Sequence, residues 1–382
     1  MKETKFKQTD IGLIPEDWVV KNLADVGPIR MCKRIMKYQT NDTGDIPFYK
    51  IGTFGKKADA FIAKELYNEF RKKYNYPQKG DILLSAAGTI GRTVVFDGEP
   101  AYFQDSNIVW IENKENLVIN HLLYYIYHRI NWITDTGTIP RIYNGNVRSI
   151  LFALPLVIEE QKRIANALNQ MDDLIAALDE QIEKKKLIKQ GAMQQLLTGK
   201  TRLKGFTGEW ETMKLGNVQI DNGQMLKSSE YISGNVPVIA GGKTPAGFHN
   251  KANRKKDTIT ISGSGAYAGF VAFWEKPIFA SDCSTINEQS KFKIRFLYYS
   301  LLLQQEEIYK CQAGGAQPHV HAKDIKDIEL HIPPALDEQQ AIASTLSAMD
   351  EEIQTLQEER DKYALVKQGM MQQLLTGKIR LN

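Results

Sequence analysis

Residues 155–203 read PLVIEEQKRIANALNQMDDLIAALDEQIEKKKLIKQGAMQQLLTGKTRL, and residues 333–381 read PPALDEQQAIASTLSAMDEEIQTLQEERDKYALVKQGMMQQLLTGKIRL. About half of the positions are identical without a gap, so that Glu160 matches Glu338. Self-similarity over such a long segment indicates that a structural unit has been duplicated. The chain therefore contains two copies of this segment, and each copy follows a different stretch of sequence.

The similarity extends beyond the repeated segment in both halves. Each half opens with the pattern W-x4-L-x2-V, which begins at Trp18 and again at Trp210. Residues 82–92 and 259–270 both combine an apolar run, typical of a strand, with a glycine-rich turn. The sequence thus predicts two related globular domains that differ between these shared landmarks.

The repeated segments have the spacing of coiled-coil helices. Apolar residues recur at alternating intervals of four and three, which places them on one narrow stripe of a helix. Proline precedes each segment and glycine follows it, so each helix can extend over up to about 39 residues. The predicted coiled-coil core residues are Ile164, Leu168, Met171, Ile175, Leu178, Ile182, Ile342, Leu346, Met349, Ile353 and Leu356.

A narrow apolar stripe needs a partner helix, and the other copy in the same chain can supply it. Residues 158–204 contain nine basic and seven acidic residues, whereas residues 334–382 contain five and eight. We therefore expect an antiparallel pair. In that pair Lys184, Lys185, Lys186 and Lys189 would lie near Asp337 and Glu338. Gly191 and Gly369 lie inside the helices, where each costs about 1 kcal/mol of helix propensity and allows a break or kink.

These patterns predict an α+β fold. It has two mixed α/β domains in a pseudo-two-fold repeat, joined by two long helices that form an antiparallel coiled coil. The predicted boundaries are 1–157 for the first domain, 158–203 for the first helical region, 204–334 for the second domain and 335–382 for the second helical region.

Composition excludes several classes of protein. The net charge is only +4 over 382 residues, so any binding of nucleic acid must come from local patches. Three cysteines are too few for a disulfide framework or a closed zinc site, which is typical of proteins in a reducing cytoplasm. The N-terminal residues are polar, and there is no run of about 18 apolar residues. We expect a cytoplasmic protein.

The motifs of the common DNA enzymes are not recognisable. No carboxylate cluster for a nuclease metal, no cofactor pocket of a methyltransferase and no P-loop of a helicase can be identified. The GKT triplets at 199–201 and 242–244 resemble the end of a P-loop, but Gln194 and Pro237 stand where its first glycine is required. The pair His319 and His321 lacks a third metal ligand. The sequence predicts a non-catalytic protein without its own metal or cofactor.

Basic patches and two polar loops are the candidates for binding DNA. Arginine can read guanine, and asparagine or glutamine can read adenine, while lysines contact phosphates. The loops at 137–150 and 315–325 carry such residues, and the residue types differ between the copies. A polar turn before the last strand is the alternative interpretation of both loops. The predicted DNA-binding residues are Arg30, Lys33, Arg34, Arg92, Arg141, Tyr143, Asn144, Asn146, Arg148, Lys243, Arg254, Lys255, Gln317, His319, His321 and Lys323.

With two variable domains, each followed by E-Q-x3-A-x2-L-x2-M-D and K-Q-G-x-M-Q-Q-L-L-T-G-K-x-R-L, the chain resembles the specificity subunit of type I restriction-modification systems. The openings IPEDW at 14–18 and GFTGEW at 205–210 fit this resemblance, which covers essentially the whole chain. It implies two target-recognition domains that read the parts of a split, asymmetric DNA sequence. It also implies that the paired helices act as a ruler between the domains and as a docking surface.

The same resemblance implies the partners. Two modification subunits would bring AdoMet and methylate adenine, and restriction subunits would add translocation and cleavage driven by ATP with Mg²⁺. Two other hypotheses remain open at this stage. The chain could be a coiled-coil scaffold whose domains bind proteins, or an orphan specificity subunit that sequesters modification subunits.

Overall fold

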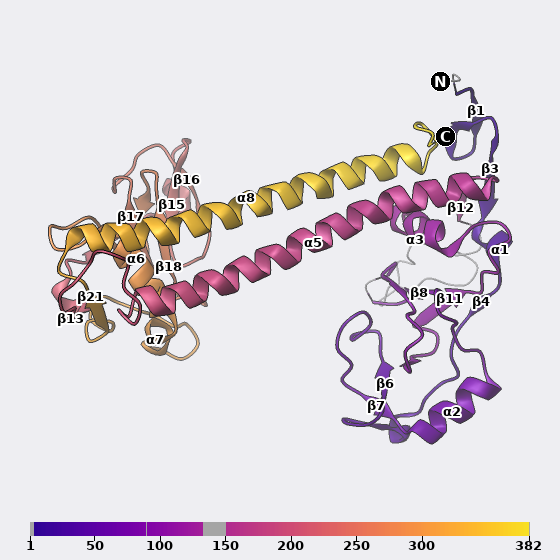
Figure 1. Ribbon diagram of the computed structural model, residues 1–382, viewed down its shortest axis with the longest axis horizontal. Coiled ribbons are helices and arrows are strands. Elements are labelled where there is room, and N and C mark those ends of the chain that lie inside the picture. The colour runs from indigo at the N-terminus through magenta and orange to yellow at the C-terminus, as the bar shows by residue number, and fades with distance from the viewer. Residues whose placement is uncertain (1–3, 89, 133–149, 382) are drawn as a thin grey trace. The chain divides into compact units, whose positions relative to one another are not determined.

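The computed structural model describes residues 4–88, 90–132 and 150–381, which form two compact units. Unit 1 comprises residues 1–177 and 360–382, and unit 2 comprises residues 178–359 (Figure 1). Each unit contains one globular domain and a part of each long helix. The boundary between the units therefore crosses both long helices.

Among the described residues, the domain of unit 1 contains three short helices and many short strands. The helices are α1 (Leu23–Val26), α2 (Lys64–Lys73) and α3 (Asn120–Arg129), with a 3-10 turn η1 (Lys37–Gln39). The strands are β1 (Phe6–Thr9), β2 (Gly12–Pro15), β3 (Trp18–Asn22), β4 (Ile29–Arg30), β5 (Thr40–Asn41), β6 (Ile46–Tyr49), β7 (Phe61–Ile62), β8 (Ile82–Ser85), β9 (Thr93–Val95), β10 (Tyr102–Phe103), β11 (Ile108–Ile111) and β12 (Leu151–Pro155).

The domain of unit 2 is built in the same way. Its helices are α6 (Ile294–Leu303) and α7 (Gln305–Lys310), with 3-10 turns η2 (Leu215–Asn217) and η3 (Ser228–Glu230). Its strands are β13 (Glu211–Lys214), β14 (Asp221–Asn222), β15 (Val236–Ile239), β16 (Gly247–His249), β17 (Thr258–Ser262), β18 (Val271–Trp274), β19 (Phe279–Ala280), β20 (Cys283–Ile286) and β21 (Glu329–Ile332).

Two sheets of each domain correspond strand by strand. The order β4-β11-β8-β9 in unit 1 matches β14-β20-β17-β18 in unit 2, and the pair β12-β3 matches β21-β13. In both domains a further sheet contains a parallel pair, β6 with β10 and β15 with β19, whereas the β1-β2 sheet occurs only in unit 1. The duplicated fold predicted from the sequence is therefore confirmed.

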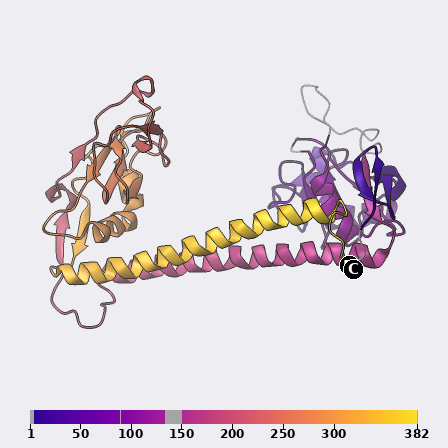
Figure 2. The ribbon, with the colours of Figure 1, turned by 90° about the horizontal axis from the view of Figure 1, so that it is seen from above.

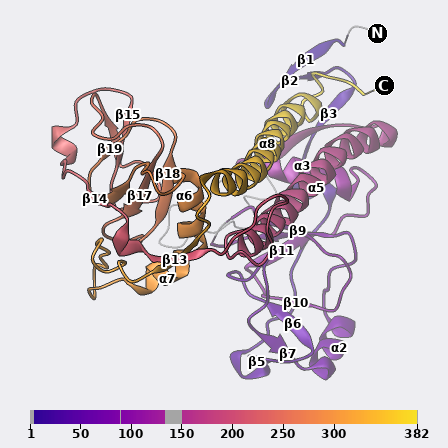
Figure 3. The same cartoon turned by 60° about the vertical axis from the view of Figure 1, so that its left-hand side comes forward.

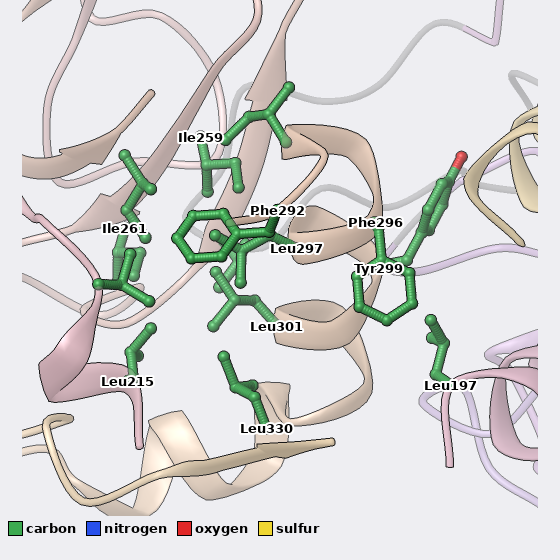
Figure 4. Packing of buried hydrophobic residues seen from close by; sticks show 14 of the residues in the cluster. Leu197, Leu215, Ile259, Ile261, Phe292, Phe296, Leu297, Tyr299, Leu301 and Leu330 are labelled. Carbon is green, nitrogen blue, oxygen red and sulfur yellow. The ribbon is translucent and has the colours of Figure 1, made fainter. Parts of the chain in front are cut away.

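A hydrophobic core links each domain to the helices of its own unit. In unit 2 the strand residue Ile259 and the helix residues Phe296 and Leu297 are fully buried in one cluster with Ile342 and Leu346 (Figure 4). Helix α6 packs between the sheet and the long helices (Figure 3). The corresponding cluster of unit 1 joins α3 to Ile164, Leu168 and Leu374. Each domain is thus packed onto the helices and not merely tethered to them.

The two long helices are α5 (Ile158–Leu196) and α8 (Leu336–Leu374). Every residue of the predicted stripe is buried or half-buried. Within unit 1, Asp172 of α5 bonds Lys367 of α8, and Glu160 near the start of α5 bonds Arg380 beyond the end of α8. The helices therefore run antiparallel and side by side, as predicted (Figure 2).

One detail of the helix prediction was wrong. The lysines do not meet Asp337 and Glu338; within unit 2, Lys189 bonds Asp350 at 2.5 Å and Lys185 bonds Glu352 at 2.6 Å. Lys186 bonds Glu183 of its own helix, and Glu338 pairs with Arg202. Neither helix breaks at Gly191 or Gly369, because the hydrogen-bonded helix continues past both residues.

Candidate nucleic-acid interface

In unit 2 the glycine-rich turn and the histidine loop lie against each other. The amide of Gly265 donates to the carbonyl of Pro318 at 3.0 Å, and the amide of Val320 donates to the carbonyl of Gly263 at 3.0 Å. His319 also forms backbone bridges to Ser264 and Ala313. Two loops that the sequence marked separately, 263–269 and 313–321, are therefore one hydrogen-bonded surface.

A third loop, 240–244, packs against the glycine-rich turn. A β-carbon on Gly241 would lie 2.3 Å from the carbonyl oxygen of Ser264, so only glycine fits where these two backbones meet. The loop then presents Lys243, whose ammonium lies 4.8 Å from the centre of the Tyr267 ring. The Ser264 hydroxyl donates to the carboxylate of Asp282. We call the loops 240–244, 263–269 and 313–323 the unit 2 loop surface.

The polar side chains of the unit 2 loop surface are positioned but accessible. Gln317, His321 and Lys323 are exposed, and His319 is half-buried with its ring parallel to that of His321 at 6.1 Å. The amide of His321 donates to Asp324, which fixes the loop. Because the backbone is fixed by hydrogen bonds, these side chains offer donors and acceptors at little entropic cost. Such a surface can read base edges.

The other two predicted residues of unit 2 differ in their surroundings. Lys255 is exposed. Arg254 uses its guanidinium inside the fold, because it donates to the hydroxyl of Thr285 at 2.8 Å and to the carbonyl of Asn222 at 2.7 Å. Arg254 therefore joins β14 to β20 and has little donor capacity left for a phosphate or a base.

Sequence reasoning missed two residues near the unit 2 loop surface. Tyr267 has 45% of its surface exposed and Met225 has 69%. The loop of Met225 reaches this surface because the amide of Leu226 donates to the hydroxyl of Ser281, the neighbour of Asp282. Neither residue has a charge or a motif in the sequence. Only a large exposed apolar side chain among polar loops marks them as candidates for contact.

Unit 1 has a basic cleft at the corresponding end of its sheet. Arg34 pairs with Asp105 at 2.8 Å and keeps 65% of its side chain exposed. The ammonium of Lys33 lies 5.4 Å from the ring of Tyr74, and Lys73 approaches the same ring at 5.6 Å. Two basic patches that are far apart in the sequence, 30–34 and 71–73, thus line one open cleft of about 670 Å³.

The remaining predicted residues of unit 1 are bonded within the fold or fall outside the described residues. Arg30 pairs with Glu112 at 2.7 Å, and Arg92 donates to the carbonyl of Phe54 at 2.8 Å. The loop at 137–150 falls almost entirely outside the described residues. Of the predicted DNA-binding residues, Arg141, Tyr143, Asn144, Asn146 and Arg148 lie outside them.

Metal ligands do not cluster in the part of the chain that the structure describes. No group of three histidines, cysteines or carboxylates there could hold a metal ion. Burial raises the pKa of the Cys32 and Cys283 thiols to about 12, so both stay protonated and unreactive at neutral pH. None of the described helices is long and apolar enough to cross a membrane.

The helices carry a second set of matched contacts. In unit 1, Tyr125 donates to Asp172 at 2.8 Å and Lys367 bonds the same carboxylate. In unit 2, Tyr299 donates to Asp350 at 2.7 Å and Lys189 bonds it. Burial raises the pKa of both tyrosines, so both remain donors. The repeated sequence motif therefore encodes the pairing of each domain with the helices.

Comparison with known proteins agrees with this arrangement. The profile described as "Type I restriction modification DNA specificity domain" matches residues 15–185 and 207–362. A putative type I restriction enzyme specificity subunit of Haemophilus influenzae is 57% identical over 180 residues, which cover 47% of this chain and 46% of that protein. A putative type I specificity subunit of Methanocaldococcus jannaschii is 29% identical over 100% of this chain and 98% of its own length.

A solved structure has the same fold. The crystal structure of a type I restriction-modification S subunit from M. genitalium superposes with a TM-score of 0.66 and 17% sequence identity. The match covers 97% of this chain and 98% of that chain. The scaffold and sequestering hypotheses are not favoured by these matches. Because the profile matches both domains together with parts of both long helices, the chain belongs to the family of type I restriction-modification DNA specificity subunits.

Proposed function

We propose that this chain recognises a DNA target of two different parts, one read by each domain, and that it has no catalytic activity of its own. The observation that carries the proposal is that the two domains have different side chains at matching positions of one loop, the loop before η1 in unit 1 and before η3 in unit 2. The turns η1 and η3 start with the same contact, in which Met36 and Lys227 donate backbone N–H to a side chain three residues later. Two residues before them stand Arg34 and Met225.

Different side chains at matching positions support an asymmetric target. An arginine can donate to guanine or to a phosphate, whereas a methionine offers only apolar contact, for instance with the methyl group of thymine. The basic cleft of unit 1 fits a phosphate backbone, and the polar loops of unit 2, which carry Gln317 and two histidines, fit base edges. A chain with two identical readers would instead suit a palindrome.

The helices support two matching sites for partner subunits. Leu187 and Ile188 on α5 have 68% and 48% of their surfaces exposed, and their repeat equivalents Leu365 and Val366 on α8 have 69% and 43%. Exposed apolar pairs at equivalent positions fit two copies of one partner. We propose that these partners are the modification subunits, which methylate adenine with AdoMet, and that restriction subunits with ATP and Mg²⁺ complete a cytoplasmic complex.

The test is to co-express the chain with its modification subunit and to map methylated adenines across the host genome. We expect one split, asymmetric sequence motif that disappears when this chain is omitted. Exchange of residues 1–157 for another recognition domain should then change one part of the motif only. Absence of new methylation, with both proteins soluble and associated, would contradict the proposal.

A further inference from the structure

The domains join the long helices through short connections. In unit 1 strand β12 ends at Pro155 and α5 begins at Ile158, so only Leu156 and Val157 lie between them, and both are exposed. In unit 2 strand β21 ends at Ile332, and the connection to α8 contains Pro333 and Pro334. Pro155 of unit 1 matches Pro333, so the unit 2 connection has one more proline, Pro334, in place of Leu156. Because proline fixes the backbone angle φ, the second connection is the stiffer one.

An arginine bridges the connection in unit 1. Arg380 donates to both oxygens of Glu160 in the first turn of α5, at 2.5 and 2.7 Å. It also donates to both oxygens of Asp17, next to β3 in the domain, at 2.8 Å each. Its guanidinium lies 5.8 Å from the ring centre of Trp18. We call Arg380, Glu160 and Asp17 the first clamp.

Unit 2 has an equivalent second clamp, formed by Arg202, Glu338 and the carbonyl of Gly208. Arg202 donates to both oxygens of Glu338 at 2.6 and 2.7 Å, and to the carbonyl of Gly208 at 2.6 Å. The Glu338 side chain is 1% exposed and that of Glu160 is 6% exposed. Buried ion pairs of this kind contribute less to stability than to the choice of one arrangement.

The clamps differ at one position. The shared W-x4-L-x2-V opening places Glu209 at the position of Asp17, but the described contacts include no hydrogen bond or ion pair between Glu209 and Arg202. The first clamp therefore has a second carboxylate where the second clamp has a backbone carbonyl. The extra carboxylate is found in the unit whose connection to the helix has one proline fewer.

A planar guanidinium that bonds two carboxylates through paired contacts fixes their angle as well as their distance. In the first clamp those carboxylates belong to the domain and to α5. We propose that Arg380 and Arg202 are positioning residues that fix the angle between each domain and the helices, with Asp17 completing the first clamp. The inference rests on the proposed function: because the clamps fix these angles, they limit how far the spacing between the two parts of the DNA target can vary.

The first test uses the full chain with its modification subunit and compares Asp17→Asn with Glu209→Gln. Both side chains are exposed at equivalent positions, but only Asp17 belongs to a clamp. We expect Asp17→Asn to keep both parts of the motif and to raise methylation about tenfold at sites whose spacer is one base pair longer or shorter, the effect of one lost charge-assisted contact. Glu209→Gln should leave the spacing as strict as in the wild type.

Arg380→Lys keeps the charge and loses the paired contacts, so it should relax the spacing in the same direction. Unchanged strictness in Asp17→Asn and Arg380→Lys would overturn the proposal. A change in either half of the motif would also overturn it, because a positioning residue should not alter base readout.

A second measurement does not depend on DNA. Spin labels at Glu99→Cys in the domain and Asn166→Cys on α5, in a chain with Cys311→Ser, report the distance distribution within unit 1; all three native positions are at least partly accessible. Asp17→Asn should broaden this distribution, and Glu209→Gln should not. An unchanged distribution overturns the clamp. A broadened distribution, with no methylation by the wild-type complex, would support the clamp and contradict the proposed function.

Discussion

Gln161 and Gln339 are buried glutamines that each form several hydrogen bonds to the backbone. Gln339 is fully buried; it accepts from the amide of Lys293 at 2.8 Å and donates to the carbonyl of Pro333 at 2.9 Å. Gln161 does the same with Ile119 and Pro155 in unit 1. Each glutamine satisfies backbone groups at the point where the domain meets the helix. This is a physical reason for a glutamine after the glutamate in both copies of the repeat.

Replacing this amide should be costly. Gln339→Leu leaves the amide of Lys293 and the carbonyl of Pro333 buried without partners, so the free energy of unfolding of unit 2 should fall by about 3 kcal/mol. The neighbouring Gln340 is exposed, and Gln340→Leu is the control with an expected change below about 0.5 kcal/mol. Urea unfolding followed by tryptophan fluorescence measures both. Equal midpoints for the two variants would contradict this account of the buried amide.

The sequence alone does not show which basic side chains are bonded within the fold. Arg254 and Lys255 are adjacent basic residues, yet Arg254 is bonded within the fold and Lys255 is exposed. The difference depends on Thr285 and Asn222, which lie on other strands. A single sequence does not reveal such long-range partners, because a basic residue looks the same whether its donors are used or free.

At the scale of the elements, the apolar spacing predicted both long helices and their length of about 39 residues. The intervals of four and three, with proline before and glycine after, limit where such helices can extend. The spacing did not predict the ion pairs, because a heptad stripe buries the same residues at several offsets along the partner helix. The contacts of Lys189 with Asp350 and of Lys367 with Asp172 distinguish the offset that occurs.

The helix interior offers a simple stability prediction. Gly191 is exposed, and nothing lies within 4 Å of a β-carbon placed there, so Gly191→Ala should stabilise unit 2 by about 1 kcal/mol through helix propensity. Gly199 has a φ of +70° and faces the ring of Trp210, so Gly199→Ala should destabilise it. Thermal unfolding should move the two melting temperatures in opposite directions. A lower melting temperature for Gly191→Ala would indicate that the helix must bend there.

The exposed apolar pairs on the helices lead to a prediction about stoichiometry. If Leu187 with Ile188 and Leu365 with Val366 each bind one modification subunit, Leu187→Glu with Ile188→Glu should reduce the complex from two bound subunits to one. The same substitutions at Leu365 and Val366 should have the same result, and the combination should remove both. Mass photometry counts the bound subunits. Two subunits bound to each double variant would show that the docking surface lies elsewhere.

For the whole molecule, the repeat in the sequence predicted the duplicated fold, because both copies retain the residues that join domain and helix. Trp18 and Trp210, Glu160 and Glu338, and Arg202 and Arg380 occupy matching contacts. The loops that would read DNA lack this support. Their residues differ between the copies, and their convergence depends on backbone bonds such as that of Gly265 to Pro318. Shared contacts can be recognised by comparison of the halves, whereas loop geometry cannot.

The continuous helices make the spacing of the target adjustable by design. One heptad inserted after Ala177 in α5, and one after Glu359 in α8, where the boundary between the units crosses the two helices, adds about 10.5 Å to the pair while it keeps the apolar stripe in phase. At 3.4 Å per base pair, the spacer of the methylated motif should grow by about three base pairs, with both parts of the motif unchanged.

A four-residue insertion in α5 alone is the matched control. It moves Lys189 away from Asp350 and turns the stripe beyond it away from α8, so the complex should lose activity and not gain a new spacer. Methylation mapping distinguishes the two designs in one experiment. An active double-heptad variant that still methylates the original spacer would show that the length of the paired helices does not set the distance between the two parts of the target.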